Sequence, residues 1–207
     1  MGLWDSLDLQ PTRHRVVTLV GGGGKTTLMY ALAQEVRAAG GSVIVTTTTH
    51  ILPHPRLFLT QETRREPLRA LLDAHGILCL GQRSQEGKLQ GAGGLDVCQT
   101  VAHAVLVEGD GAKFLPLKAP ADHEPVIPPE SGAVAAVAGM DCLGRPIQAI
   151  CHRPERVCAL LGAGAEHVLT PEDVALLLAN PQGGRKGVGE AMALRLSRDF
   201  SAFSYCI

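Results

Sequence analysis

The feature that most constrains this chain is a run of four glycines followed by Lys-Thr-Thr, from Gly21 to Thr27. The run comes directly after residues 16–20, whose mostly apolar, β-branched side chains are typical of a buried parallel strand. Glycines let the backbone adopt positive φ and turn its N–H groups toward one point, and no side chain blocks the approach of a ligand. The segment therefore predicts a strand, a tight loop and then a helix.

The residues after the loop follow a helical pattern over 25–39, which ends at a glycine pair, Gly40-Gly41. The unpaired N–H groups and the dipole at the start of such a helix favour an anion. We expect Lys25 to reach the β- and γ-phosphates of a nucleotide and the Thr26 hydroxyl to hold Mg²⁺. The candidate phosphate-binding residues are Gly21, Gly22, Gly23, Gly24, Lys25, Thr26 and Thr27.

This loop differs from the full phosphate-loop pattern G-x-x-x-x-G-K-[ST] at one position, because Leu19 stands where the first glycine would be. The alternative, a glycine-rich turn that binds nothing, is disfavoured because the strand and the helix on either side agree with the motif. Val20 occupies the place where the paired-ATPase form of the loop carries a second lysine. Hydrolysis activated by dimerisation through that lysine is therefore not expected.

A second apolar run, residues 104–107, ends in Glu108-Gly109-Asp110. A carboxylate at the end of a buried strand can bind Mg²⁺, directly or through water, and can polarise an attacking water. We therefore take Lys25, Glu108 and Asp110 as candidate catalytic residues, and Thr26 with the two acids as candidate metal ligands; either acid could meet the metal. The alternative is a strand followed by a simple Gly-Asp-Gly turn.

A threonine run at the end of the apolar segment 42–50 points to the same region, since ligands bind at the carboxyl ends of parallel strands. We name Thr47 and Thr48 as candidates to contact Mg²⁺ or the γ-phosphate. Thr47 and Thr49 share one face of the strand and Thr46 and Thr48 the other, so only one set can face a ligand. The alternative is that these β-branched residues only build the strand.

The proline-rich segment 113–130 lacks any periodicity, so we expect an extended loop whose shape the prolines fix. It carries Lys118, His123 and Glu124, which we take as candidates to bind a second substrate beside the phosphate site. The alternative is a solvated linker.

Apolar runs and helical patterns alternate along the rest of the chain, which predicts a three-layer α/β fold with a mostly parallel central sheet flanked by helices. We expect one domain over 1–207, with residues 1–15 as a lead-in. Four further elements are expected before residue 140: a helix over 60–74, a strand over 77–80, a polar surface loop over 81–94 and a strand over 134–138. After it we expect a short helix that ends at Leu161, a helix from its N-cap Thr170 to Asn180, and a last helix over 189–200.

The composition favours a cytoplasmic protein that binds neither nucleic acid nor membrane. The net charge is −1 and the basic residues are scattered. No apolar run approaches the ~18 residues that span a bilayer, and residues 1–15 lack the apolar core of a signal peptide. The six cysteines show no C-x-x-C or other metal-binding spacing, so we expect reduced thiols in the core. No Asn/Thr-Lys-x-Asp guanine signature occurs, so GTP specificity is unsupported and ATP is the expected nucleotide.

Taken together and in this order, five motifs between Val16 and Gly189 resemble those of the YqeC family of selenium-dependent hydroxylase accessory proteins. They are Val20–Thr27, Thr46–Thr49, Val107–Ala112, Pro116–Pro120 with His123–Pro128, and His152–Glu155. The acidic motif reads Glu-Gly-Asp where the family leads us to expect Glu-Ala-Asp, and the segment 81–103 is shorter than expected. Neither departure removes a candidate ligand.

The resemblance implies a P-loop NTPase-like protein that acts in the maturation of selenium-dependent molybdenum hydroxylases, the enzymes of purine and xanthine-type catabolism. Our leading hypothesis is Mg²⁺-dependent ATP binding with hydrolysis or phosphoryl transfer, with the hydroxylase or its cofactor as partner. One alternative is a nucleotide-gated cofactor chaperone with little intrinsic hydrolysis, which the lack of an evident arginine finger favours. Another is a small-molecule kinase or nucleotidyltransferase whose loop from Lys118 to Glu124 binds the acceptor.

Overall fold

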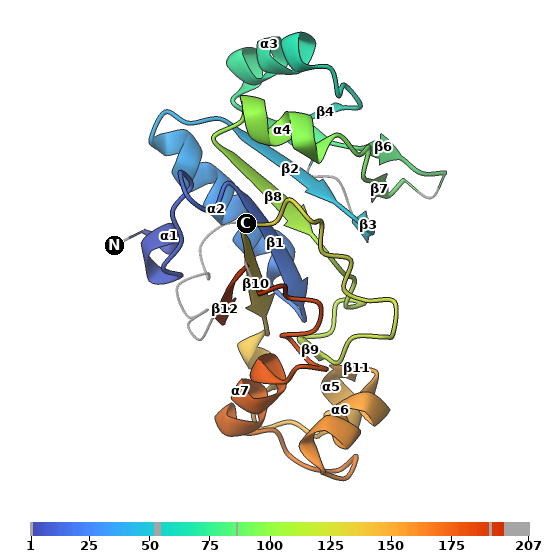
Figure 1. Cartoon of the computed structure of the whole chain (residues 1–207). Coiled ribbons are helices and arrows are strands. Elements are labelled where there is room, and N and C mark those ends of the chain that lie inside the picture. The colour runs from blue at the N-terminus through green and yellow to red at the C-terminus, as the bar shows by residue number, and fades with distance from the viewer. Residues whose placement is uncertain (1, 52–54, 86, 191, 197–207) are drawn as a thin grey trace.

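The computed structural model describes residues 2–51, 55–85, 87–190 and 192–196. At its centre is a seven-stranded sheet in the order β12-β10-β1-β8-β2-β5-β4 (Figure 1), and all its neighbouring strands run parallel. This confirms the α/β fold with a mostly parallel sheet. The strands are β1 (Val16–Gly21), β2 (Val43–Thr47), β4 (Phe58–Thr60), β5 (Ile77–Leu80), β8 (Ala104–Glu108), β10 (Ala133–Val137) and β12 (Ala193–Leu196).

The register of the central strands places the glycine loop (residues 21–24) and the acidic loop (residues 108–110) together at the carboxyl ends of the strands. β1 pairs with β8 so that Leu19 lies opposite Glu108, and β2 pairs with β8 so that Thr47 lies opposite the same residue. On its other side β1 pairs with β10, with Gly21 opposite Val137. The three segments that follow β1, β2 and β8 therefore leave the sheet at nearly the same level.

Both faces of this sheet are covered, because successive side chains of each strand point to opposite sides and both sets are apolar. Helix α2 (Lys25–Ala38) packs on one face through Leu28, Met29 and Leu32, and the short α1 (Leu3–Ser6) joins the same apolar cluster through Trp4. On the other face, α3 (Arg65–His75) and α4 (Leu95–Val101) cover the part formed by β2, β5 and β8. These layers confirm the three-layer arrangement.

A further group of helices covers the same second face at β1 and β10, and Figure 1 shows it gathered at the end of the molecule opposite α3 and α4. It consists of η1 (Met140–Cys142), α5 (Ile147–Ile150), α6 (Pro154–Leu161) and α7 (Pro171–Ala179). Helix α7 begins as predicted, with Thr170 as N-cap and a proline in its first turn.

Two small sheets lie outside the central one. Strands β3 (His50–Ile51), β7 (Leu89–Gln90) and β6 (Gln82–Arg83) form an antiparallel sheet, so part of the expected loop 81–94 is paired. In the proline-rich segment, β9 (Leu117–Lys118) pairs with β11 (Cys151–His152), which places Lys118 opposite His152. The proline-rich segment is thereby attached to the start of α6.

Three sequence predictions need correction. The helix expected over 189–200 is wrong, because residues 193–196 form β12 along the edge of β10; the alternating pattern Ala-Leu-Arg-Leu also suits a strand, and residues 197–200 lie outside the described part. The helix expected over 60–74 begins only at Arg65, after β4. The strand expected over 42–50 ends at Thr47, where the chain turns toward β3. No helix in the described ranges has the length and apolar character needed to cross a bilayer.

Candidate functional site

Backbone geometry explains why the loop between β1 and α2 is built of glycine. Gly21 and Gly24 have φ values of +106° and +92°, in the left-handed region that other residues rarely adopt. The N–H of Gly22 donates to the Val137 carbonyl at 2.7 Å, and the N–H of Gly23 donates to the Pro116 carbonyl at 3.0 Å. These two amides attach the loop to β10 and to the proline-rich segment, so they are not directed at an anion.

The amides that remain available are those at the start of α2. The N–H groups of Gly24, Lys25, Thr26 and Thr27 have no hydrogen-bond partner among the described residues, as is usual for the first turn of a helix. Gly24 and Thr27 are exposed. Unpaired amides at the N-terminus of a fourteen-residue helix form a favourable environment for a phosphate.

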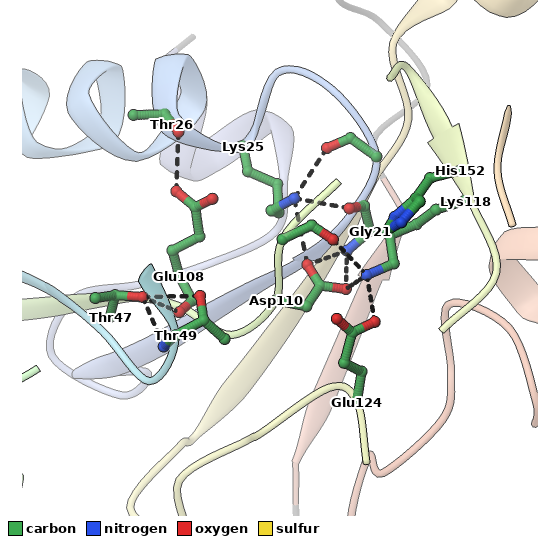
Figure 2. Close-up of polar contacts among 12 residues, drawn as sticks. Gly21, Lys25, Thr26, Thr47, Thr49, Glu108, Asp110, Lys118, Glu124 and His152 are labelled. Carbon is green, nitrogen blue, oxygen red and sulfur yellow. Dashed lines mark hydrogen bonds and ion pairs between the residues drawn. The ribbon is translucent and has the colours of Figure 1, made fainter. Parts of the chain in front are cut away.

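Lys25 is held against the loop rather than extended into solvent (Figure 2). Its Nζ donates to the carbonyls of Gly21 at 2.7 Å and Gly22 at 3.1 Å, and lies 3.2 Å from Asp110 Oδ1. The side chain is only 4% exposed. A buried ammonium therefore lies within the glycine loop, next to the open end of α2.

Asp110 is a buried carboxylate shared by two lysines. Both of its oxygens accept the N–H of Gly21 at 3.0 Å, and Oδ2 lies 3.0 Å from Lys118 Nζ. Its side chain is 2% exposed. The contacts to Gly21, Lys25 and Lys118 use the capacity of both oxygens, so this carboxylate acts as the counter-ion that positions two cations.

The ion pairs continue from Lys118 into the proline-rich segment and α6. Lys118 Nζ donates to Glu124 Oε2 at 2.7 Å, and the same oxygen accepts from Arg153 Nη1 at 2.8 Å. Burial by itself would raise the pKa of Glu124, but the hydrogen bond and charge of Lys118 and the hydrogen bonds from Arg153 and the Ala121 amide outweigh it and lower this pKa to about 2. We call the series Lys25, Asp110, Lys118, Glu124 and Arg153 the ion network.

Two members of this region were not identified as site residues from the sequence. Arg153 has a φ of +62° and stands directly before α6, which directs its side chain to Glu124. His152 precedes it and lies beside Lys118 in Figure 2, and the pKa of His152 is lowered by burial first and then by the charges of Arg153, Lys118 and Lys113. The available signal was the motif His152–Glu155, which otherwise reads only as the start of a helix.

Glu108, the other acid, makes a separate contact with α2. Thr26 Oγ1 donates to Glu108 Oε2 at 2.8 Å, and the Glu108 residue is 7% exposed. Burial raises the pKa of Glu108, while the charge of Lys25 and the hydrogen bond from Thr26 act in the opposite direction. A hydroxyl and a carboxylate side by side form the oxygen donor set that Mg²⁺ prefers.

The hydroxyls of Thr47, the last residue of β2, and of Thr48, which follows it, donate to backbone carbonyls. Thr47 Oγ1 donates to the Glu108 carbonyl at 2.9 Å and lies 3.2 Å from Thr49 Oγ1. Thr48 Oγ1 donates to the Val126 carbonyl at 2.8 Å. These contacts join the ends of β2 and β8 to the proline-rich segment, so in this structure Thr47 and Thr48 support the backbone on which Glu108 stands.

Of the candidates in the proline-rich segment, Lys118 and Glu124 are brought into the ion network and His123 is not. His123 is exposed, and within the described residues no hydrogen bond links it to the other candidates. The site thus has two parts, Thr26 with Glu108 and the ion network, which meet at Lys25.

Comparison with known proteins gives two matches. The family model described as YqeC protein matches residues 17–155, a range that contains every candidate residue named above. A protein from Escherichia coli K12 described as "Uncharacterized protein YqeC" is 34% identical over 111 residues, which is 51% of this chain and 43% of that protein. The match thus spans less than half the length of this relative. No solved structure matches the chain.

Proposed function

The chain belongs to the YqeC family, and from this premise we propose that it binds ATP with Mg²⁺ at the start of α2 and either hydrolyses it or transfers its terminal phosphoryl group. The observation that carries the proposal is the contact of Thr26 with Glu108 at 2.8 Å, directly beside the open amides of α2. A phosphate site and an oxygen donor set for Mg²⁺ thus lie next to each other.

The phosphate-binding groups in this proposal are the amides of Gly24 to Thr27, and the Lys25 ammonium, whose donors face Gly21, Gly22 and Asp110, adds a positive charge beside them. These residues fit an anion because the amides are unpaired and a cation is held in the same loop. The amides of Gly22 and Gly23 take no part, since both donate to carbonyls that fix the loop. This narrows the set of candidates derived from the sequence.

Glu108 and Thr26 would hold the metal. Asp110 does not fit that role, because both of its oxygens already accept from Gly21 and face the two lysines. Bound Mg²⁺ supplies neutralisation of the charge on the transferring phosphate oxygens. Asp110 keeps Lys25 and Lys118 in place, and Thr47 holds the backbone carbonyl of Glu108.

We extend the proposal to the biological role that the family resemblance implies, the maturation of selenium-dependent molybdenum hydroxylases. The partner is then the hydroxylase or its cofactor. A nucleotide-gated chaperone with slow intrinsic hydrolysis is the second candidate. The saturation of Asp110 by Lys25, Lys118 and Gly21 favours it, because this acid has no free oxygen with which to activate water.

The test is Mg²⁺-dependent binding and turnover of ATP, with GTP measured alongside, by the wild type and two variants. We expect Lys25→Ala to weaken ATP binding by at least about tenfold, since it removes the positive charge beside the phosphate-binding amides. We expect Glu108→Gln to bind ATP but to lose the gain in affinity from Mg²⁺. Glu172→Gln, an exposed glutamate on α7, is the matched control.

Two outcomes separate the candidates. Turnover by the isolated protein supports an enzyme, whereas tight binding with turnover that rises only when a partner is added supports the chaperone. If the folded wild type binds neither nucleotide, or if Lys25→Ala binds as well as the wild type, the proposal fails.

A further inference from the structure

A cavity of about 120 Å³ lies between the proline-rich segment, α6 and residues 182–186. It has roughly ten times the space that a single water needs, so it suits a small organic molecule. Part of its wall is apolar and part is polar. The apolar part includes Ala119, Pro120 and Leu160, and the polar groups are those of Arg156, Gln182 and Lys186.

The charge of this cavity is positive, because two cations line it and no carboxylate does. Arg156 Nη1 donates to Asp122 Oδ1 at 2.8 Å, and Lys186 Nζ donates to the Asp122 carbonyl at 3.1 Å. The Asp122 side chain is 90% exposed, so solvent screens its charge. Arg156 retains guanidinium donors beyond Nη1, and such a planar fork matches a carboxylate or phosphate.

The cavity adjoins the ion network. Pro120 lines it and also lines a much smaller cavity of about 10 Å³, whose wall includes Gly21, Asp110 and Lys118. Arg153, the last member of the ion network, donates to the Ala119 carbonyl at 3.4 Å. Helix α6, which carries Arg156, and β9, which leads into Ala119, lie together at the same end of the fold (Figure 1).

We propose that this cavity binds a small organic anion, a carboxylate or a phosphate monoester of roughly ten non-hydrogen atoms, with its charged group on Arg156 and Lys186 and its apolar body against Leu160. This molecule is the second substrate of the nucleotide reaction. That role rests on the proposed function, whereas binding of the anion does not.

The test uses nucleotide-free, isotope-labelled protein titrated with benzoate, phenyl phosphate and the uncharged benzyl alcohol, followed by backbone amide chemical shifts. We expect saturable shifts at Leu160 and Gln182 with the two anions at concentrations up to about 10 mM, and none with the alcohol. If the cavity is built for a carboxylate, benzoate should bind more tightly than phenyl phosphate. If it is built for a phosphate monoester, phenyl phosphate should bind more tightly. Absence of saturable shifts with both anions, or equal shifts with the alcohol, overturns the proposal.

A pair of variants tests whether Lys186 contacts the bound anion. Lys186→Gln should weaken anion binding by about tenfold, because it removes one charged contact. Arg185→Gln is the matched control: Arg185 is exposed, adjacent in the chain and absent from the cavity wall, so its loss should leave binding unchanged. Equal weakening in both variants would mean that the anions respond to overall charge, and would overturn the site.

The two proposals fail in different ways. If the anions bind as expected but the wild type binds no nucleotide, the anion site stands and the nucleotide reaction is rejected. If nucleotide binds but neither anion does, only the second-substrate site is rejected.

Discussion

Replacing Glu124 by glutamine tests whether the ion network stabilises the fold. The substitution keeps the shape of the side chain but removes the charge that faces both Lys118 and Arg153. Since the pKa of Glu124 falls from 4.5 to about 2 in the folded chain, the charged form is favoured by roughly 3 kcal/mol. The side chain is only 12% exposed, so solvent screening removes little of this.

The sign of the pH dependence follows from the lowered pKa. A carboxylate whose pKa is depressed on folding stabilises the protein fully above its unfolded pKa, and this stabilisation is lost as the pH falls through the folded value of about 2. Near neutral pH, Glu124→Gln should therefore be less stable than the wild type by roughly 3 kcal/mol. The difference should shrink steadily below about pH 4.5.

The measurement is urea unfolding of both proteins at several pH values between about 7 and 3. Glu190→Gln, which removes an exposed glutamate from a loop, is the control and should match the wild type throughout. A stability difference that does not change with pH would refute the electrostatic explanation, and so would a difference below about 0.5 kcal/mol at neutral pH.

Three further predictions concern local structure. Gly22→Ala should destabilise the fold by roughly 1–3 kcal/mol in urea unfolding, since its Cβ would lie 1.9 Å from the Pro116 carbonyl oxygen, whereas Gly111→Ala, with no atom within 4 Å, should be neutral. Cys98, whose pKa burial raises to about 12, should resist a thiol reagent near pH 8 until the protein unfolds, as peptide mass spectrometry would detect; rapid labelling of the native chain would contradict this. Thr170→Ala removes the N-cap of α7 and should cost about 1 kcal/mol in thermal unfolding; an unchanged midpoint would argue against the cap.

The parts of the fold that the sequence predicted well are those with local signals. The glycine run marked the junction of β1 and α2, and the apolar runs marked β8 and β10. The meeting of the glycine loop with the acidic loop followed from the general geometry of parallel sheets. The pattern of residues 193–196 was ambiguous, and the open edge of β10 decided in favour of a strand.

The different roles of Glu108 and Asp110 could not be predicted from the sequence. Glu108 is the last residue of β8 and meets Thr26, whereas Asp110 lies after the turn at Gly109 and meets Lys25. Which acid meets which partner depends on the path of the chain after β8, and no residue type in this segment predicts that path. The contact of Arg153 with Glu124 likewise depends on the pairing of β9 with β11, which joins distant segments.

The position of β1 between β8 and β10 has a consequence for how the protein is made. Its two neighbours, β8 and β10, come from residues 104–108 and 133–137, so during synthesis β1 and α2 emerge long before either neighbour exists. Until then the nascent chain carries an apolar strand with both edges unpaired, a state that invites association with other chains. Arg153 emerges later still, so the ion network can close only after this residue has been translated.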